Sequence, residues 1–212
     1  MKAQLAPQSP RRDLASLSEV PLDAHHAALL ERVKSSCGGS APWRHRKQAE
    51  AFDLCRLSQI SRRLVILHLD LTMDLRVDLL LQVTVPCMPN PKERLEVADT
   101  ARLGIIYREE SMMLPQPGYS FVQILAPRPV WHANVSSDSV QALCLGPSLP
   151  AGLPLREIIL MCYGALTMMT VQLDPANSAG VLNPAAAEWF QRNPGLIPLS
   201  REPFLQPVGA KQ

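Results

Sequence analysis

The sequence has no marked excess of either charge. Its 21 lysines and arginines nearly balance 19 aspartates and glutamates, so the formal net charge is only +2. The nearest approach to a basic cluster is the short run Arg44–Lys47. Nucleic-acid binding proteins usually carry a basic stripe that follows the phosphates, and none is present here. We therefore expect no nucleic-acid partner.

Long apolar segments are also missing. No stretch approaches the roughly 20 apolar residues that a membrane-spanning helix needs. The segment Met1–Asp13 is polar and contains prolines, unlike the apolar core of a secretion signal. We therefore expect a cytoplasmic protein without a membrane span. Hydrophobic residues still make up 47% of the chain, which is enough to build the core of one domain.

Paired cysteines are absent as well. The five cysteines are scattered, odd in number and form no Cys-X-X-Cys pair, and the histidines show no ligand-like spacing. Neither a zinc site nor a disulfide framework is indicated, so we expect reduced thiols and no metal or organic cofactor. Each cysteine is then either a small buried apolar residue or a reactive nucleophile. They are Cys37, Cys55, Cys87, Cys144 and Cys162.

Prolines, in contrast, are abundant and punctuate the chain. Residues 1–42 are expected to form a flexible leader, with a short helix over Asp23–Lys34 and a Gly- and Pro-containing break just before residue 43. Residues 43–200 are predicted to form the folded domain. Residues 201–212 are expected to be a C-terminal tail.

Hydrophobic periodicity predicts an α+β domain. Apolar residues recur at three- and four-residue steps over Trp43–Ser61, which predicts a helix with basic residues on its opposite side. Three extended runs follow at 64–69, 75–85 and 95–107, separated by turn signals. Strands adjacent in sequence usually pair, so these runs predict an antiparallel meander.

The second half of the domain differs in composition. Residues 111–154 are rich in proline, which prevents a long helix or ladder and predicts an ordered loop of the kind that often carries function. A buried helix is predicted over residues 155–171. Asn183-Pro184 then starts another helix that continues through Arg192, with proline in its first turn.

The segment with the most chemical information lies in the Pro-rich region. It contains His132, Ala133 and Asn134, and Cys144 follows ten positions after the asparagine. A helix, a meander, a Pro-rich segment with a His-X-Asn triplet, and then a Cys-Leu pair resemble the ubiquitin-conjugating (UBC-like) family in that order. The long helix after the cysteine and the later Leu182–Ala187 segment (Leu-Asn-Pro-Ala-Ala-Ala) extend the resemblance over residues 43–192.

The chain departs from the family pattern at three places. Ala133 stands where the triplet usually has proline, and the gap between Asn134 and Cys144 is about two residues longer than in typical eukaryotic members. The acidic residue expected after the Asp-Pro link is missing, because Asn177 and Ser178 stand in that region. This divergence resembles bacterial members that accompany ubiquitin-like modifiers.

The resemblance implies a thioester carrier. Cys144 would take a ubiquitin-like modifier from an activating enzyme and pass it to the amine of a target protein, with or without a ligase. A thiolate suits this role because it is both a strong nucleophile and a good leaving group. Asn134 would either donate a hydrogen bond to the oxyanion or fix the loop. His132 is expected to bond to backbone and hold the triplet's turn. Asp138 or Asp174 would assist deprotonation of the amine.

Two alternatives stay open at this point. The same fold without catalysis, as a module that only binds a modifier or partner, would explain Ala133 and the missing acid. A cysteine hydrolase would need His132 as the base. Docking of the activating enzyme is expected on the first helix, at Arg44, Arg46 and Lys47. The sequence does not distinguish an amide product from an ester.

Overall fold

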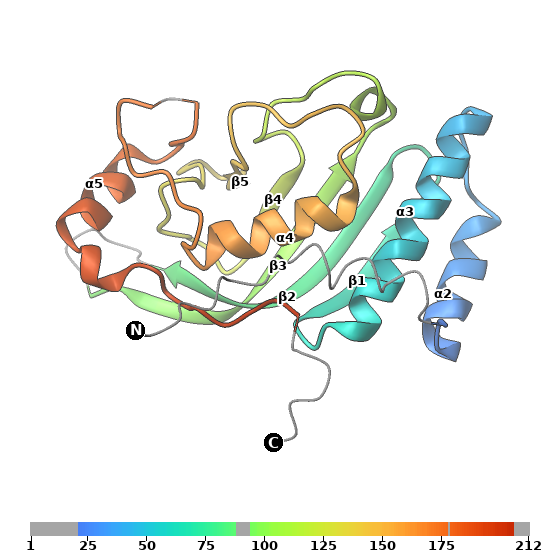
Figure 1. Ribbon diagram of the computed structural model, residues 1–212, viewed down its shortest axis with the longest axis horizontal. Coiled ribbons are helices and arrows are strands. Elements are labelled where there is room, and N and C mark those ends of the chain that lie inside the picture. Colours follow the sequence, from blue (N-terminus) through green and yellow to red (C-terminus); the bar gives the residue numbers. More distant parts are fainter. Residues whose placement is uncertain (1–20, 88–93, 178, 206–212) are drawn as a thin grey trace, which may run out of the picture.

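One five-stranded antiparallel sheet, in the order β1-β2-β3-β4-β5, organises the chain (Figure 1). The computed structural model describes residues 21–87, 94–177 and 179–205. The strands are β1 (Leu64–Asp70), β2 (Leu75–Cys87), β3 (Glu96–Tyr107), β4 (Val122–Ala126) and β5 (Ala142–Leu143). The helices are α2 (Ala24–Lys34), α3 (Ala41–Ile60), α4 (Leu155–Leu166) and α5 (Pro184–Arg192), and 3-10 turns occur at η2 (Glu109–Met112) and η3 (Pro194–Leu196). The predicted α+β class and the meander are confirmed.

The alternating pattern of β2 explains where the core lies. Residues Leu75, Val77, Leu79 and Leu81 are buried in turn, whereas the residues between them are more exposed. Successive side chains of a strand point to opposite faces, so one face of the sheet is apolar. Helix α4 lies across this face and contacts β2, while α3 covers β1 (Figure 1). The core therefore forms between the sheet and these two helices.

One strand was not predicted, and one predicted boundary was wrong. The Pro-rich region contains β4, which pairs with β3 although prolines follow it. Helix α4 ends at Leu166 rather than near residue 171. Met168 adopts a left-handed backbone conformation (φ 62°), and the Thr170 amide turns back to the Gly164 carbonyl at 3.1 Å. This reversal carries the chain away from the helix axis, although Met168, Met169 and Val171 continue the apolar pattern.

The buried face of α3 also differs from the prediction. The helix pattern predicts Lys47 among the basic residues on the exposed side, yet Lys47 and also Glu50 are buried. The Lys47 ammonium binds the carbonyls of Leu71 and Met73. Glu50 pairs with Arg46 at 2.6 Å and accepts the Leu155 amide at 2.8 Å. The expected docking surface at Arg44, Arg46 and Lys47 is therefore wrong for Lys47, which is 0% exposed.

Segments outside residues 43–200 contribute to the same core. Leu30 and Val33 of α2 are buried, and α2 packs against α3. Near the other end, Phe204 is buried and contacts the Tyr163 ring at 5.3 Å between centroids. The domain boundaries at residues 43 and 200 remain predictions, although the core includes buried residues on the outer side of each. Most of the predicted leader, residues 1–20, lies outside the described residues.

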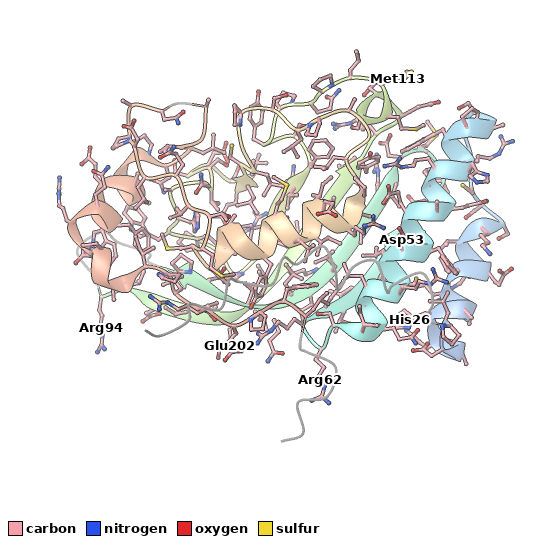
Figure 2. The ribbon with its side chains drawn as sticks, viewed as in Figure 1. His26, Asp53, Arg62, Arg94, Met113 and Glu202 are labelled. Atoms are coloured by element: carbon pink, nitrogen blue, oxygen red, sulfur yellow. The ribbon has the colours of Figure 1, made fainter. Side chains whose placement is uncertain are left out.

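Two labelled side chains illustrate the surface of the fold, one in an ion pair between helices and one exposed to solvent. In Figure 2, Asp53 of α3 lies toward α4, where it pairs with Arg156 at 2.9 Å. Met113 projects outward from the connection between β3 and β4 and is strongly exposed.

Within the described parts of the chain, no helix combines the length and apolar character that crossing a membrane requires.

Candidate active site

The backbone places Cys144 and Asn134 side by side. Cys144 directly follows β5, and its amide donates to the Asn134 carbonyl at 2.7 Å. Beside this bond, Val135 and Leu143 form an isolated antiparallel bridge. Asn134 and Cys144 are ten positions apart in sequence, so this local ladder brings together two of the predicted site residues.

His132 lies fully buried behind this pair. Its Nε2 lies 2.8 Å from the Ala165 carbonyl of α4, and its Nδ1 accepts the Asn134 amide at 3.0 Å. Because Nδ1 accepts, the ring proton is on Nε2 and is donated to α4. Burial lowers the pKa of His132 to about 4, so the ring is neutral near pH 7. Both ring nitrogens are engaged by backbone, in keeping with the expected structural role and unfavourable for a hydrolase base.

The Asn134 carboxamide is occupied at both ends. Its Nδ2 donates to the Gly180 carbonyl at 2.5 Å, and its Oδ1 accepts the Gln172 amide at 3.3 Å. Of the two roles considered for Asn134, this arrangement is that of a loop anchor. The donor that would stabilise an oxyanion is directed toward Gly180 in this conformation.

The thiol of Cys144 is covered. The residue is 2% exposed, and its Sγ lies 3.3 Å from the Gly146 carbonyl and 3.5 Å from the Ala179 carbonyl. Burial raises the pKa of the Cys144 thiol, although the hydrogen bond to Gly146 opposes the shift. A nucleophilic cysteine is usually in contact with solvent, whereas in this conformation the Ala179 carbonyl lies over the Cys144 sulfur.

The same short segment covers both functional groups. Ala179 and Gly180, here called the covering residues, present consecutive carbonyls to the Cys144 thiol and to the Asn134 amide. Asn177 holds this segment from one side, because its Oδ1 accepts the Ala179 amide at 3.2 Å. On the other side the amides of Leu182 and Asn183 both donate to the Ala133 carbonyl at 2.9 Å.

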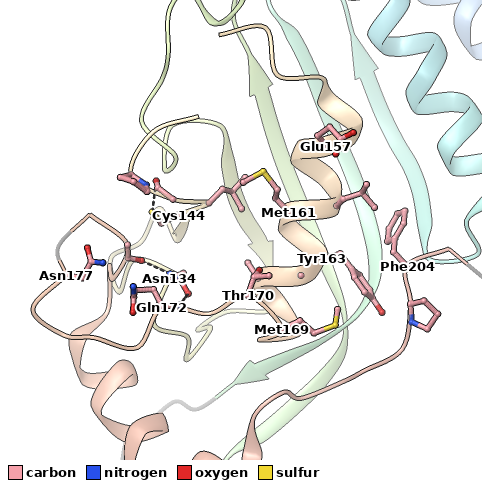
Figure 3. Close-up of a pocket in the computed structure, with 18 of the residues that line it drawn as sticks. Asn134, Cys144, Glu157, Met161, Tyr163, Met169, Thr170, Gln172, Asn177 and Phe204 are labelled. Atoms are coloured by element: carbon pink, nitrogen blue, oxygen red, sulfur yellow. Dashed lines mark hydrogen bonds between the residues drawn. The ribbon is translucent and has the colours of Figure 1, made fainter. Parts of the chain in front are cut away.

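A cavity of about 750 Å³ opens beside Cys144 (Figure 3). Its walls are mainly apolar and come from α4, from the loop that contains Cys144, and from the segment around Phe204. Polar groups gather where Asn134, Gln172 and Asn177 meet. The apolar lining includes Leu145, Leu160, Met161, Met169, Phe204 and Leu205. A volume of this size accommodates an extended side chain or a short peptide segment.

The predicted acids are not at this cavity. Asp138 Oδ1 accepts the Ser136 hydroxyl at 2.8 Å and the amides of Val140 and Gln141, which lowers its pKa and stabilises a turn. Asp174 accepts the Ala176 amide at 3.0 Å in another turn. Neither residue lines the cavity, whereas Glu157 on the first turn of α4 does. Glu157 could not be predicted as a site residue, because the apolar pattern of this helix shows no polar face that points to a site.

Of the three buried cysteines, Cys144 alone lines the cavity. Cys55 and Cys162 are fully buried within helices α3 and α4, and burial raises the pKa of both, that of Cys55 to about 11. Neither lines the cavity. In the described part of the chain, no cluster of three or more His, Cys, Asp or Glu side chains could hold a metal ion.

No protein-family model matches the sequence, and neither a curated protein nor a solved structure shows significant similarity to the chain.

Proposed function

We propose that this chain is a ubiquitin-conjugating-type acyl carrier that holds a ubiquitin-like modifier as a thioester on Cys144. The observation that carries the proposal is the backbone pairing of Cys144 with Asn134 in the wall of the mainly apolar cavity. The order of helix, meander, Pro-rich loop and C-terminal helices supports the UBC-like assignment. The partners would be an activating enzyme, the modifier, a target amine and, where one takes part, a ligase.

The chemistry consists of two acyl transfers. First, the Cys144 thiolate attacks the thioester carbonyl of the donor; a new carbon–sulfur bond forms, and the donor thiolate leaves and takes up a proton. Second, the amine nitrogen attacks the Cys144 thioester, the carbon–sulfur bond breaks, and the amine loses a proton to water. Both steps pass through a tetrahedral oxyanion, which needs a hydrogen-bond donor nearby.

The covering residues must move before either step. Loss of the Ala179 contact would expose the sulfur, and loss of the Gly180 contact would free Asn134 Nδ2 to donate to the oxyanion. A preorganised side-chain amide contributes on the order of 2.7–4 kcal/mol in acyl-transfer sites. The observed conformation is then the resting, protected form of the carrier.

A synthetic peptide thioester with a C-terminal Gly-Gly tests the proposal without a known modifier. Incubation with the full chain should give a mass increase equal to the peptide minus its leaving thiol, reversed by excess reductant thiol. Cys144→Ala should abolish the adduct, whereas Cys87→Ala, at a half-buried cysteine on β2, should retain it. An adduct that persists in Cys144→Ala would refute the assignment.

A binding module without catalysis is the second candidate. The observations that favour it are the 2% exposure of Cys144 and the engagement of both ends of the Asn134 amide. Under this reading the thiol is a packing residue. Peptide thioester would then leave Cys144 unmodified in the native chain, while the same thiol would react after unfolding in urea.

A further inference from the structure

The segment that carries the covering residues leaves the body of the fold and returns to it near one place. At its start, the Gln172 amide donates to Asn134 Oδ1 at 3.3 Å. At its end, the Leu199 amide donates at 3.0 Å to the carbonyl of Thr167, the residue that closes α4. The chain between these anchors, residues 173–198, is here called the lid and contains the covering residues, α5 and η3. Both of its ends are therefore attached near the C-terminal end of α4.

Hydrogen bonds inside the lid join its loop to α5. Gln191 Nε2 of α5 donates to the Leu173 carbonyl, at the start of the loop, at 2.7 Å. Asn193 Nδ2 donates to the Trp189 carbonyl at 2.8 Å and closes the end of the helix. The element that α5 contacts most is η3, which also belongs to the lid. These bonds tie the parts of the lid to one another, as expected for a segment that moves as one body.

The apolar contacts beneath the lid form a small cluster of their own. Val181 and Ala187 of the lid are buried together with Ala133, and Val171 and Leu173 pack against them. None of these residues belongs to the main core between the sheet, α3 and α4. Small satellite clusters are typical beneath long loops. A segment held by few apolar contacts opens at a lower free energy than the core does.

The cavity beside Cys144 separates the lid from α4. Asn177 and Gly180 line it from the lid, whereas Met161 and Gly164 line it from α4. Figure 3 shows Asn177 and Met161 on opposite sides of this space. Over this surface the lid therefore lacks the close packing on α4 that would join it to the main core.

We propose that the lid opens as one body while the main core stays folded, so that the docking of α5 regulates access to Cys144. Opening would remove Ala179 from the Cys144 sulfur and Gly180 from the Asn134 amide in a single event. The regulatory meaning of this inference rests on the proposed carrier function, because it names the element that controls the same site. The opening itself needs neither modifier nor activating enzyme, so it can be measured separately.

The variant Val181→Ala tests the inference. It removes two buried methyl groups from the satellite cluster, which should favour the open lid by about tenfold. Iodoacetamide labelling of Cys144 without urea should accelerate by that factor. Hydrogen exchange should accelerate across the lid, but not in β2 or α4.

The matched control is Val33→Ala, the same change at a buried residue of α2 in the main core. This variant should lower the urea midpoint of unfolding and leave Cys144 labelling without urea at the native rate.

A second variant, Gln191→Ala, acts at an exposed position where a folding defect is not expected. Loss of the hydrogen bond to Leu173 should accelerate Cys144 labelling by about two- to tenfold, the range expected for one hydrogen bond.

Two results would overturn the inference. One is an unchanged labelling rate of Cys144 in both lid variants, and the other is an equal acceleration in Val33→Ala, which would place the lid in the main cooperative unit. Failure of the carrier function gives a different result. Peptide thioester would then leave Cys144 unmodified in every variant, while labelling would still accelerate in Val181→Ala and the lid would be confirmed.

Discussion

At the scale of single residues, Asn134 joins the two parts of the candidate site. Its amide holds Gly180 and the Gln172 backbone, while its own carbonyl accepts the Cys144 amide. The side chain of Asn134 therefore holds Gly180 in place, while the backbone of the same residue holds Cys144. The loop-anchor and oxyanion roles, which the sequence left as alternatives, make opposite predictions for its removal.

Asn134→Ala should make Cys144 react faster with iodoacetamide, because the covering residues lose the hydrogen bond from Asn134 Nδ2 to the Gly180 carbonyl. The same change should slow loading from peptide thioester, because no amide remains to donate to the oxyanion. Stability should fall by about 1–3 kcal/mol, the usual cost of orphaned buried polar groups. Alkylation and loading rates measured on the same sample check both effects. Faster alkylation together with faster loading would contradict the oxyanion role.

His132 makes a separate prediction about acid stability. Its pKa is lowered to about 4 in the folded chain and is near 6.5 when unfolded, so its contribution is complete above pH 6.5. That contribution is lost as pH falls toward 4, because the unfolded state binds the extra proton. The shift corresponds to about 3 kcal/mol.

Urea unfolding between pH 7 and pH 4 measures this loss. His132→Gln keeps a donor for the Ala165 carbonyl and removes the titration, so its stability should fall less steeply over this range. Carboxylates titrate in both proteins and cancel in the comparison. Parallel curves for the two chains would show that His132 does not contribute.

At the scale of elements, the junction of α3 and α4 depends on a buried carboxylate. Glu50 on α3 accepts the first amide of α4, at Leu155, which no intrahelical carbonyl can satisfy. Burial raises the pKa of Glu50, while the Leu155 amide and Arg46 oppose the shift. The start of α4, which carries Glu157, is thereby fixed by a residue more than a hundred positions away.

Glu50→Ala should destabilise the chain by about 1–3 kcal/mol, because the Leu155 amide loses its acceptor in a buried position. Hydrogen exchange at the first turn of α4 should accelerate more than exchange at its last turn. Glu188→Ala, on the exposed side of α5, is the control and should change little. Equal protection along α4 in both variants would contradict the capping role.

Helix α2 offers a test of where the domain begins. Leu30 is buried against α3, so Leu30→Ala should cost about 2–5 kcal/mol in urea unfolding. Glu31→Ala on the exposed side of the same helix should cost far less. A negligible effect of Leu30→Ala would mean that residues 24–34 are dispensable, as a leader would be.

Elements with clear periodicity were predicted well from the sequence, and others were not. Strand β2 alternates over its length, and Pro184 marks the start of α5, so both lie where the pattern places them. Strand β4 is short and followed by prolines, and its pairing depends on β3 as a template. The burial of Lys47 depends on carbonyls at the turn after β1, which a helix pattern cannot reveal.

At the scale of the whole molecule, the site combines segments that are distant in sequence. The resemblance to the UBC-like family grouped His132, Asn134 and Cys144 into one predicted site, and the bridge between Val135 and Leu143 brings Asn134 and Cys144 together. The cover, Glu157 and the Phe204 wall come from later segments that only tertiary packing brings to the cavity. The sequence could therefore single out Cys144, but not the residues that cover it or line the cavity beside it.

The central claim is that the cover over Cys144 opens locally, whereas a packing cysteine is exposed only by global unfolding. Rates of iodoacetamide labelling, resolved for each cysteine by peptide mass spectrometry over low urea concentrations, test it most directly. We predict that Cys144 reacts at least about tenfold faster than Cys162, at a rate nearly independent of urea, as local opening requires. If Cys144 and Cys162 instead share one slow rate with the same urea dependence, Cys144 is a core thiol and the carrier function is wrong.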